Sequence, residues 1–404
     1  MKSTVQRALL LCLALTLVLI INPLPGWAGG GNDDGLKLVG VIPNPGPNPL
    51  VVDISYVDQR REKYYLADVS NKSVDIFDAE KSTFLGRIEG FHGPGQPSET
   101  GTGKCDTFDA NGPNGVFVAN NGRLWVTDYT GKNGVVKVFE LEGAEPPFTT
   151  VTPSATITFD GSGGTQSAGC RADELAFDPR DHIVIVGFPE PESGATPFVA
   201  FISSDPPYNV LGTLQFHGAG GMEQPVWDRK SHRLLVNVPG VGIAVIDPKN
   251  LDEPEKIYPT GCAGTGLALG PLRHLLVGCG DGPDLIMDAD TGNILTTFPA
   301  SEVANSDEVW FNQGDDNFYA TSNFAPPGPP TLAVIDAETN TFLQGVPTDF
   351  ISHSVAAFSE NNHVLVPIVW IGAPFQHDAC HVQFPALPAH QGCIFVYSNQ
   401  SDDE

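Results

Sequence analysis

One short pattern occurs seven times along the chain, and it constrains the fold more than any other feature. Each copy is an extended run of β-branched or aromatic residues that ends in an acidic or polar residue, followed by a turn and a second extended run. The end positions of the seven copies are Asp78, Glu140, Ser203, Asp247, Asp288, Asp336 and Ser398. Two more extended runs joined by a tight polar turn precede each copy, and no stretch between copies has a sustained helical period. Four short strands per unit and seven units predict an all-β fold, a seven-bladed β-propeller with four-stranded antiparallel blades.

The two ends of the repeated region predict how the ring closes. The seventh copy ends near Ser398 with no room for a fourth strand, whereas the segment LKLVGVIP at about 36–43 resembles the fourth strands of the other units. We therefore expect this N-terminal strand to complete the last blade, because a ring without closure leaves unpaired strand edges. The expected organisation is a flexible linker at 29–35, a single propeller at 36–398 and an acidic tail at 399–404.

The N-terminus has the pattern of a secretory signal. Lys2 and Arg7 precede an apolar run, and Gly26-Trp27-Ala28 offers small residues at a cleavage site, so residues 1–28 are interpreted as a cleaved signal peptide. The alternative is an uncleaved anchor helix, although the run is shorter than the ~20 apolar residues of a membrane span. We expect a secreted or periplasmic protein, with no membrane attachment after cleavage.

Charge limits the partners of the mature chain. Without residues 1–28 the chain has 19 basic and 48 acidic side chains, a net charge of -29. Nucleic acid and anionic membranes are therefore poor partners, because both repel an acidic surface. A small molecule, a glycan or a protein remains as a partner, and the chain is expected to be a monomer.

Six cysteines follow the signal, an even number that suggests three disulfides in an exported protein. Pairing by proximity, one of fifteen connectivities, joins Cys105 with Cys170, Cys262 with Cys279, and Cys380 with Cys393.

Strands alternate in direction within a blade, so connections from fourth to first strand and from second to third strand lie at one end of the ring, here called the upper face. All six cysteines and the long insertions lie in or beside such connections, so disulfides would brace loops on the upper face. The alternative is a reactive thiol.

The opposite, lower face receives short turns such as DAEKS, DADTG and DAETN, whose aspartates are expected to be structural.

The starts of the first strands predict a polar ring at the upper end of the central channel. Alignment places there about Asn48, Asn114, Asp173, Gln224, Thr265, Asp307 and His353, with Glu174, Glu223 and Glu308 beside them. Carboxylate and amide oxygens are hard ligands suited to Ca²⁺ or Mg²⁺. The alternative is that these groups only bind water and loop backbone in a wet channel.

Histidines divide into two groups. His182, His232, His274 and His363 occupy the same place in four units, at or just before the second strand, and belong to the repeat. The other six lie in upper-face segments, and His377 and His381 form the motif HDACH. Histidines four residues apart suit a metal on a helix, but the sequence setting is a Pro-rich loop, so a transition-metal site here is a weak hypothesis beside a solvated loop.

The chain resembles the YVTN-type repeat β-propellers, in particular their secreted bacterial members. The resemblance lies in segments such as YYLADVSNKSVDIFDAEKSTFLGRI, RADELAFDPRDHIVIV and SHSVAAFSENNHVLVP, and it spans nearly the whole mature chain. It implies the propeller fold and leaves the activity open, because propellers host many unrelated functions.

Three functions remain open, and the sequence does not decide whether the protein is an enzyme. The first is a secreted binding or scaffold protein that presents its upper face to a small molecule, glycan or protein. The second is a divalent-metal-dependent hydrolase or lyase similar to propeller lactonases, with Asn114, Glu174, Asp307 and Glu308 as metal ligands and His353 as general base. The third is a redox protein with a histidine-ligated metal.

Overall fold

The computed structural model describes residues 35–46, 51–93, 112–119, 122–129, 133–160, 171–189, 196–322, 330–349, 351–370 and 378–399. The chain divides into two units, Met1–Asp33 and Asp34–Glu404, and all described residues belong to the second. The expected signal peptide, most of the linker and the acidic tail from residue 400 on lie outside the described residues.

The described strands form seven four-stranded antiparallel sheets, which we number as blades from the N-terminus. Blade 1 contains β2 (Val52–Asp58), β3 (Lys63–Asp68), β4 (Ser73–Asp78) and β5 (Thr83–Glu89). Blade 2 contains β6 (Val116–Val118), β7 (Arg123–Tyr129), β8 (Gly134–Glu140) and β9 (Ala155–Thr158). Blade 3 contains β10 (Leu175–Asp178), β11 (Ile183–Phe188), β12 (Phe198–Ser203) and β13 (Val210–Gln215). Blade 4 contains β14 (Pro225–Asp228), β15 (Arg233–Val238), β16 (Gly242–Ile246) and β17 (Lys256–Tyr258).

The remaining blades follow the same order. Blade 5 contains β18 (Gly264–Leu269), β19 (His274–Cys279), β20 (Leu285–Asp288) and β21 (Ile294–Thr297), with the 3-10 turn η1 (Pro271–Arg273) between its first two strands. Blade 6 contains β22 (Ser306–Asn312), β23 (Asn317–Ser322), β24 (Thr331–Asp336) and β25 (Thr341–Pro347). Blade 7 contains β26 (Ala356–Phe358), β27 (His363–Ile368), β28 (Cys393–Ser398) and β1 (Lys37–Pro43), with the short helix α1 (Ala379–Gln383) before β28.

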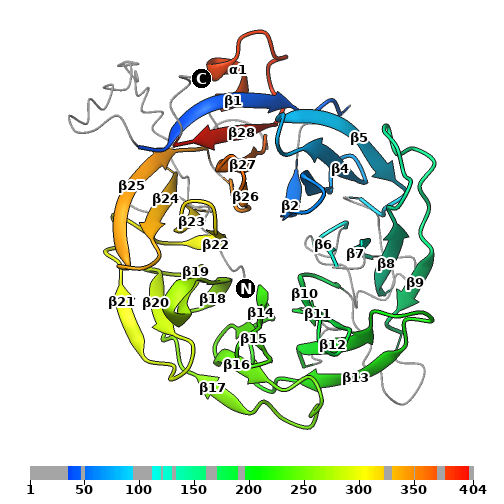
Figure 1. Cartoon of the computed structure of the whole chain (residues 1–404), viewed down its shortest axis with the longest axis vertical. Helices are drawn as coiled ribbons and strands as arrows, with labels where there is room; N and C mark the ends of the chain where they lie inside the picture. The colour runs from blue at the N-terminus through cyan, green and yellow to red at the C-terminus, as the bar shows by residue number, and fades with distance from the viewer. Residues whose placement is uncertain are drawn as a thin grey trace, which may run out of the picture. The chain divides into compact units, whose positions relative to one another are not determined.

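The blades close into a ring, as predicted. The innermost strands contact one another in the cyclic order β2, β6, β10, β14, β18, β22 and β26, and β26 returns to β2. Strand β1 pairs with β28 along the outside of blade 7, from Lys37 opposite Ser398 to Pro43 opposite Cys393. Figure 1 shows this arrangement, with β1 completing the sheet that holds the C-terminal strand. The expected seven-bladed propeller with N-terminal closure is confirmed.

The repeat found in the sequence corresponds to the third strand of each blade. Six of its seven end positions are the last residue of such a strand, and Asp247 directly follows β16. Aspartates in the lower-face turns accept backbone N–H groups, as Asp78 Oδ1 does from Lys81 at 2.9 Å and Asp336 Oδ1 does from Thr339 at 2.7 Å. The prediction that these acids are structural is therefore confirmed for these turns.

The described residues form seven hydrophobic core clusters, one between each pair of adjacent blades. In β11, Val184, Val186 and Phe188 face the cluster shared with blade 2, while Ile183 and Ile185 face the one shared with blade 4. Successive side chains of a strand point to opposite faces. Both faces of a blade are buried, so the strands are continuously apolar instead of alternating.

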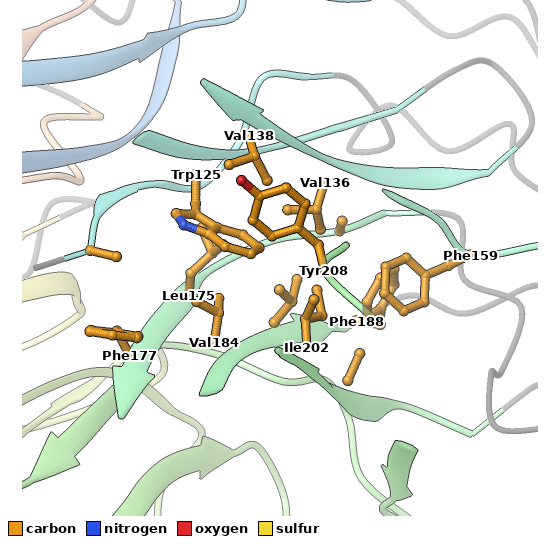
Figure 2. Close-up of a cluster of buried hydrophobic side chains, with 14 of the residues drawn as sticks. Trp125, Val136, Val138, Phe159, Leu175, Phe177, Val184, Phe188, Ile202 and Tyr208 are labelled. Atoms are coloured by element: carbon orange, nitrogen blue, oxygen red, sulfur yellow. The ribbon is translucent and has the colours of Figure 1, made fainter. Parts of the chain in front are cut away.

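Figure 2 shows the cluster between blades 2 and 3, where aromatic rings from the strands and connecting segments of both blades meet. Trp125 and Tyr208 lie edge to face with ring centroids 5.6 Å apart, and Phe159 and Phe188 lie 4.6 Å apart. This packing holds neighbouring blades together without any hydrogen-bonded ladder between them, and it fixes how the inner strands face the channel.

Two of the three expected cysteine pairs lie at bonding distance. The sulfur atoms are 2.06 Å apart in Cys262–Cys279 and 2.10 Å apart in Cys380–Cys393. Cys105 and Cys170 lie outside the described residues. The Pro-rich setting around Cys380 was expected to be a loop, but residues 379–383 form helix α1, which is only one turn long and too short to give a periodic signal in the sequence.

Candidate functional site at the upper channel mouth

The inner strands meet closely around the upper end of the channel. The backbone N–H of Glu308 donates to His353 O at 2.9 Å, and that of Gln224 donates to Thr265 O at 3.1 Å, so neighbouring blades are joined by hydrogen bonds. Glycine is required for this approach at Gly266, where an added Cβ would lie 2.3 Å from Asp307 O. The site is therefore held where the first strands begin, partly on the strands and partly in the short segments that lead directly into them.

These strands enclose a cavity of about 380 Å³, here called the upper mouth. Its charged lining consists of six carboxyl groups, one guanidinium and one imidazole: Asp53, Asp173, Glu174, Glu223, Asp307, Glu308, Arg171 and His353. Ile54, Thr265, Gly280 and Asn305 complete the lining.

Most residues predicted for the polar ring lie in this mouth, but two do not and two others were missed. Gln224 lies just below it, and Asn114 is buried with its amide donating to Ala172 O at 2.9 Å. Asn48 lies outside the described residues, and blade 1 contributes Asp53 instead. Arg171 was also missed, although it stands in the quoted segment RADELAFDP beside Asp173.

The two cations of the mouth each contact aspartate. Arg171 Nη2 lies 3.1 Å from Asp53 Oδ2 and 3.2 Å from Asp173 Oδ2, so it links blades 1 and 3 across the channel. His353 Nδ1 lies 3.5 Å from Asp307 Oδ2, and its Nε2 lies 3.1 Å from Val52 O. Both ring nitrogens of His353 thus face oxygen acceptors, an arrangement that suits the imidazolium, in which both nitrogens are donors.

The charge of His353 follows from its neighbours. Burial alone lowers the pKa of His353, but the hydrogen bond and charge of Asp307, with the charges of Asp53 and Glu308, raise it to about 9. His353 therefore carries a proton at neutral pH. In this state it donates hydrogen bonds and does not accept a proton, which is unlike the general base of the lactonase hypothesis.

Three glutamates in the mouth have raised pKa values. Burial is the main cause of the raised pKa of Glu174, followed by the charges of Glu308 and Asp173 and a hydrogen bond with Glu308. Burial also raises the pKa of Glu308 and of Glu223, and nearby aspartates add to both increases. Carboxyl groups crowded in a buried site repel one another, so they hold protons to a higher pH.

Gln224 fixes the position of Glu308 at the floor of the mouth. Its Nε2 donates to Glu308 Oε2 at 2.7 Å, and its Oε1 accepts the backbone N–H of Leu267 at 2.5 Å. Because the amide is held at both ends, Glu308 has a fixed orientation. Glu174, Gln224 and Glu308 form a hydrogen-bonded layer across the channel, which we call the carboxyl layer.

The metal hypotheses stay predictions. Among the described residues, no group of three or more His, Cys, Asp or Glu side chains is arranged to hold a metal ion. In the HDACH motif, His377 lies outside the described residues, and His381 Nδ1 contacts Leu387 O at 2.7 Å in a local hydrogen bond.

Comparisons with known proteins support the fold. No protein-family model matches the chain, and no curated protein sequence matches it. The chain is similar to the WD40 β-propeller domain of Doa1, with a TM-score of 0.60, 14% identity and coverage of 91% of this chain and 98% of that domain. It is also similar to a chain in the crystal structure of the mitotic checkpoint complex, with a TM-score of 0.59, 15% identity and coverage of 97% and 99%. At such identities the likeness shows the propeller fold alone.

Among the described residues, no helix has the length and apolar character needed to cross a membrane.

Proposed function

We propose that this propeller is a binding protein that holds a small, positively charged ligand in its upper mouth. The observation that carries the proposal is the charge of that cavity, where six carboxyl groups meet only two cationic side chains. A bound cation would relieve the repulsion that raises the pKa of the glutamates, because an opposite charge favours the ionised carboxylate. The strongly acidic chain would also attract cations over longer distances.

The proposal includes export and bracing of the upper face by disulfides. It is supported by the position of Cys262–Cys279, because Gly280, the next residue, lines the mouth and donates its N–H to Ala263 O at 3.0 Å. The disulfide thus constrains the backbone at the edge of the cavity. Export agrees with the N-terminal signal pattern and with the resemblance of the sequence to secreted YVTN-type propellers.

The test is calorimetric titration of the full chain at pH 7.5 with Ca²⁺, Mg²⁺ and the diamine putrescine, with inorganic phosphate as an anionic control. We expect binding of one of the cations and none of phosphate. Asp307→Asn and Glu174→Gln should each weaken binding by about tenfold or more, equivalent to about 1.4 kcal/mol. Asp252→Asn makes the same chemical change on an exposed turn and should have no effect.

The proposal fails if no cation binds, if phosphate binds as tightly, or if the mouth variants behave like Asp252→Asn. Binding of Ca²⁺ or Mg²⁺ in place of putrescine would identify the ligand as a metal ion. That result would also support the Ca²⁺ or Mg²⁺ site predicted from the sequence.

A further inference from the structure

A second cavity of about 320 Å³ lies in the channel beneath the carboxyl layer. Most of its lining is apolar, and it is unusually rich in large aromatic side chains, namely Tyr56, Phe117, Phe177, Trp227, Trp310 and Phe311. We call it the aromatic cavity. Apart from the aromatic residues, its polar lining residues are Glu174 and Gln224, both of the carboxyl layer, and Ser55.

The aromatic rings form a continuous wall across several blades. The ring centroid of Tyr56 lies 4.8 Å from that of Phe117 and 5.8 Å from that of Trp310, and Phe117 lies 6.3 Å from Phe177. Tyr56, Phe117 and Trp310 are only half-buried, although they lie at the centre of the ring. Solvent therefore reaches their surfaces from inside the channel, and exposed aromatic surface in a concave site is typical of small-molecule binding.

The two cavities meet at the carboxyl layer. Ile54 and Glu174 line both of them, and Gln224, in the lining of the aromatic cavity, donates to Glu308 in the lining of the upper mouth. A molecule in the aromatic cavity would thus have rings around its body and carboxyl groups at one end.

The charges at the two ends of the aromatic cavity differ, and the difference favours one orientation of a ligand. A hollow on the lower face shares Trp227, Leu269 and Phe311 with the aromatic cavity and is also lined by Arg229, Lys230 and Arg273. Lys230 pairs with Asp290 at 3.1 Å, and Arg273 binds Asp228 at 2.5 Å. Asp228 and Asp316 line the same hollow, so the charges at that end are largely balanced. The excess of carboxyl groups lies in the upper mouth, so a positive group on a ligand would point toward the carboxyl layer.

We infer that the ligand is an aromatic amine whose ring system occupies the aromatic cavity and whose ammonium group lies at the carboxyl layer. This inference rests on the proposed function, since it specifies the class of cation. A dry cavity of about 150 Å³ accommodates benzene, so a cavity of about 320 Å³ suits roughly two fused rings. Cation–π attraction to Trp and Tyr faces adds to the Coulomb attraction of the carboxylates.

The experiment compares matched ligands by calorimetry on the full wild-type chain at pH 7.5. Naphthalen-2-ylmethylammonium, naphthalen-2-ylmethanol and naphthalene-2-carboxylate share a ring system and differ in charge, and putrescine supplies ammonium groups without a ring. We expect the aromatic ammonium to bind about tenfold or more tightly than the alcohol and than putrescine, and the carboxylate to bind weakest.

A pair of variants tests the placement of the ring. Trp310→Leu should weaken the aromatic ammonium by roughly 2- to 30-fold, the range expected for one lost cation–π contact. Its effect on putrescine should stay within about twofold. Trp370→Leu makes the same change at a tryptophan that packs on His390 outside the cavity, and it should alter neither ligand.

The outcomes separate this inference from the proposed function. If the aromatic ammonium binds no tighter than putrescine or than the alcohol, or if Trp310→Leu matches Trp370→Leu, the aromatic assignment is wrong while cation binding in the mouth stands. If neither the amines nor Ca²⁺ and Mg²⁺ bind, both are wrong. The ligand series is measured on the wild-type chain and needs no variant. If the Trp310→Leu protein misfolds, that series alone can still refute the inference.

Discussion

Asp284 is a fully buried carboxyl group in blade 5, and replacing it with asparagine should make folding less sensitive to pH. It directly precedes β20, and its Oδ1 accepts the backbone N–H of Cys279 at 2.9 Å. Burial raises the pKa of Asp284 from 3.8 to about 7, although hydrogen bonds from Ser306 and Cys279 oppose the increase. The folded protein therefore keeps a proton on Asp284 over a range of pH in which the unfolded chain has lost it.

The sign and size of the effect follow from this difference in pKa. Below pH 3.8 the carboxyl group is protonated in both states, and it makes no pH-dependent contribution. As the pH rises toward 7, only the unfolded state releases the proton, so the free energy of unfolding falls by about 1.4 kcal/mol per pH unit. The loss reaches about 4 kcal/mol above pH 7. Asparagine does not titrate, so Asp284→Asn should gain that amount over the wild type between pH 4 and pH 7 and hold it above.

Urea denaturation at pH 4.0, 5.5, 7.0 and 8.5, monitored by tryptophan fluorescence, measures the free energy of unfolding of both proteins. The quantity of interest is the difference between variant and wild type as a function of pH, because titration of all other groups cancels in it. Asp252→Asn, on an exposed turn, should show a flat difference. A flat difference for Asp284→Asn as well, or one that declines with rising pH, would refute the reasoning.

Three further predictions concern packing and the mouth. Gly266→Ala should lower the free energy of unfolding by about 1 to 3 kcal/mol, because the new Cβ would overlap Asp307 O, whereas Gly282→Ala, whose Cβ meets no described atom within 4 Å, should be neutral in thermal melts. Trp125→Ala should cost about 3 to 5 kcal/mol in urea denaturation through the cavity left between blades 2 and 3, and a loss below 1 kcal/mol would contradict the packing described for that cluster. Cation affinity measured by calorimetry should rise from pH 5.5 to pH 8.5, because the mouth glutamates have raised pKa values and release their protons in that direction, and affinity that falls over this range would be inconsistent with carboxylate binding.

The fold was accessible from the sequence because its signal is local and repeated. Each third strand ends in a polar residue before a turn, and this short pattern needs no knowledge of distant contacts. Ring closure could be predicted by counting strands in each unit. The segment that ends at Pro43 has the character of a fourth strand, and the last unit lacks one. Helix α1 was missed because a single turn has no period to detect.

The site was accessible only in part, and its errors have identifiable causes. In blade 1 the Pro-rich segment before Val51 contains no repeat pattern, so the alignment stopped at Asn48 and missed Asp53. Asn114 shows the opposite error. The alignment placed this polar residue at the mouth, but its amide donates a hydrogen bond to the backbone that leads into blade 3. The sequence could not reveal protonation, since the raised pKa values of Glu174 and Glu308 arise only when the fold brings two segments that are distant in sequence together.

The carboxyl layer predicts a trade-off that separates a ligand site from a structural hydrogen-bond network. Holding Glu174 in a buried site beside other acids raises its pKa, which means that the folded state is penalised once the pH exceeds the value at which the unfolded chain ionises. Glu174→Gln removes that penalty and keeps an N–H donor for Glu308, so the ligand-free variant should be more stable than the wild type at pH 8. The same variant should bind the cation more weakly, because glutamine cannot release a proton to become the carboxylate that a bound cation favours. If Glu174 were only a hydrogen-bond partner within the fold, the variant would bind the cation as tightly as the wild type, and calorimetry in parallel with thermal melts at pH 8 distinguishes the two results.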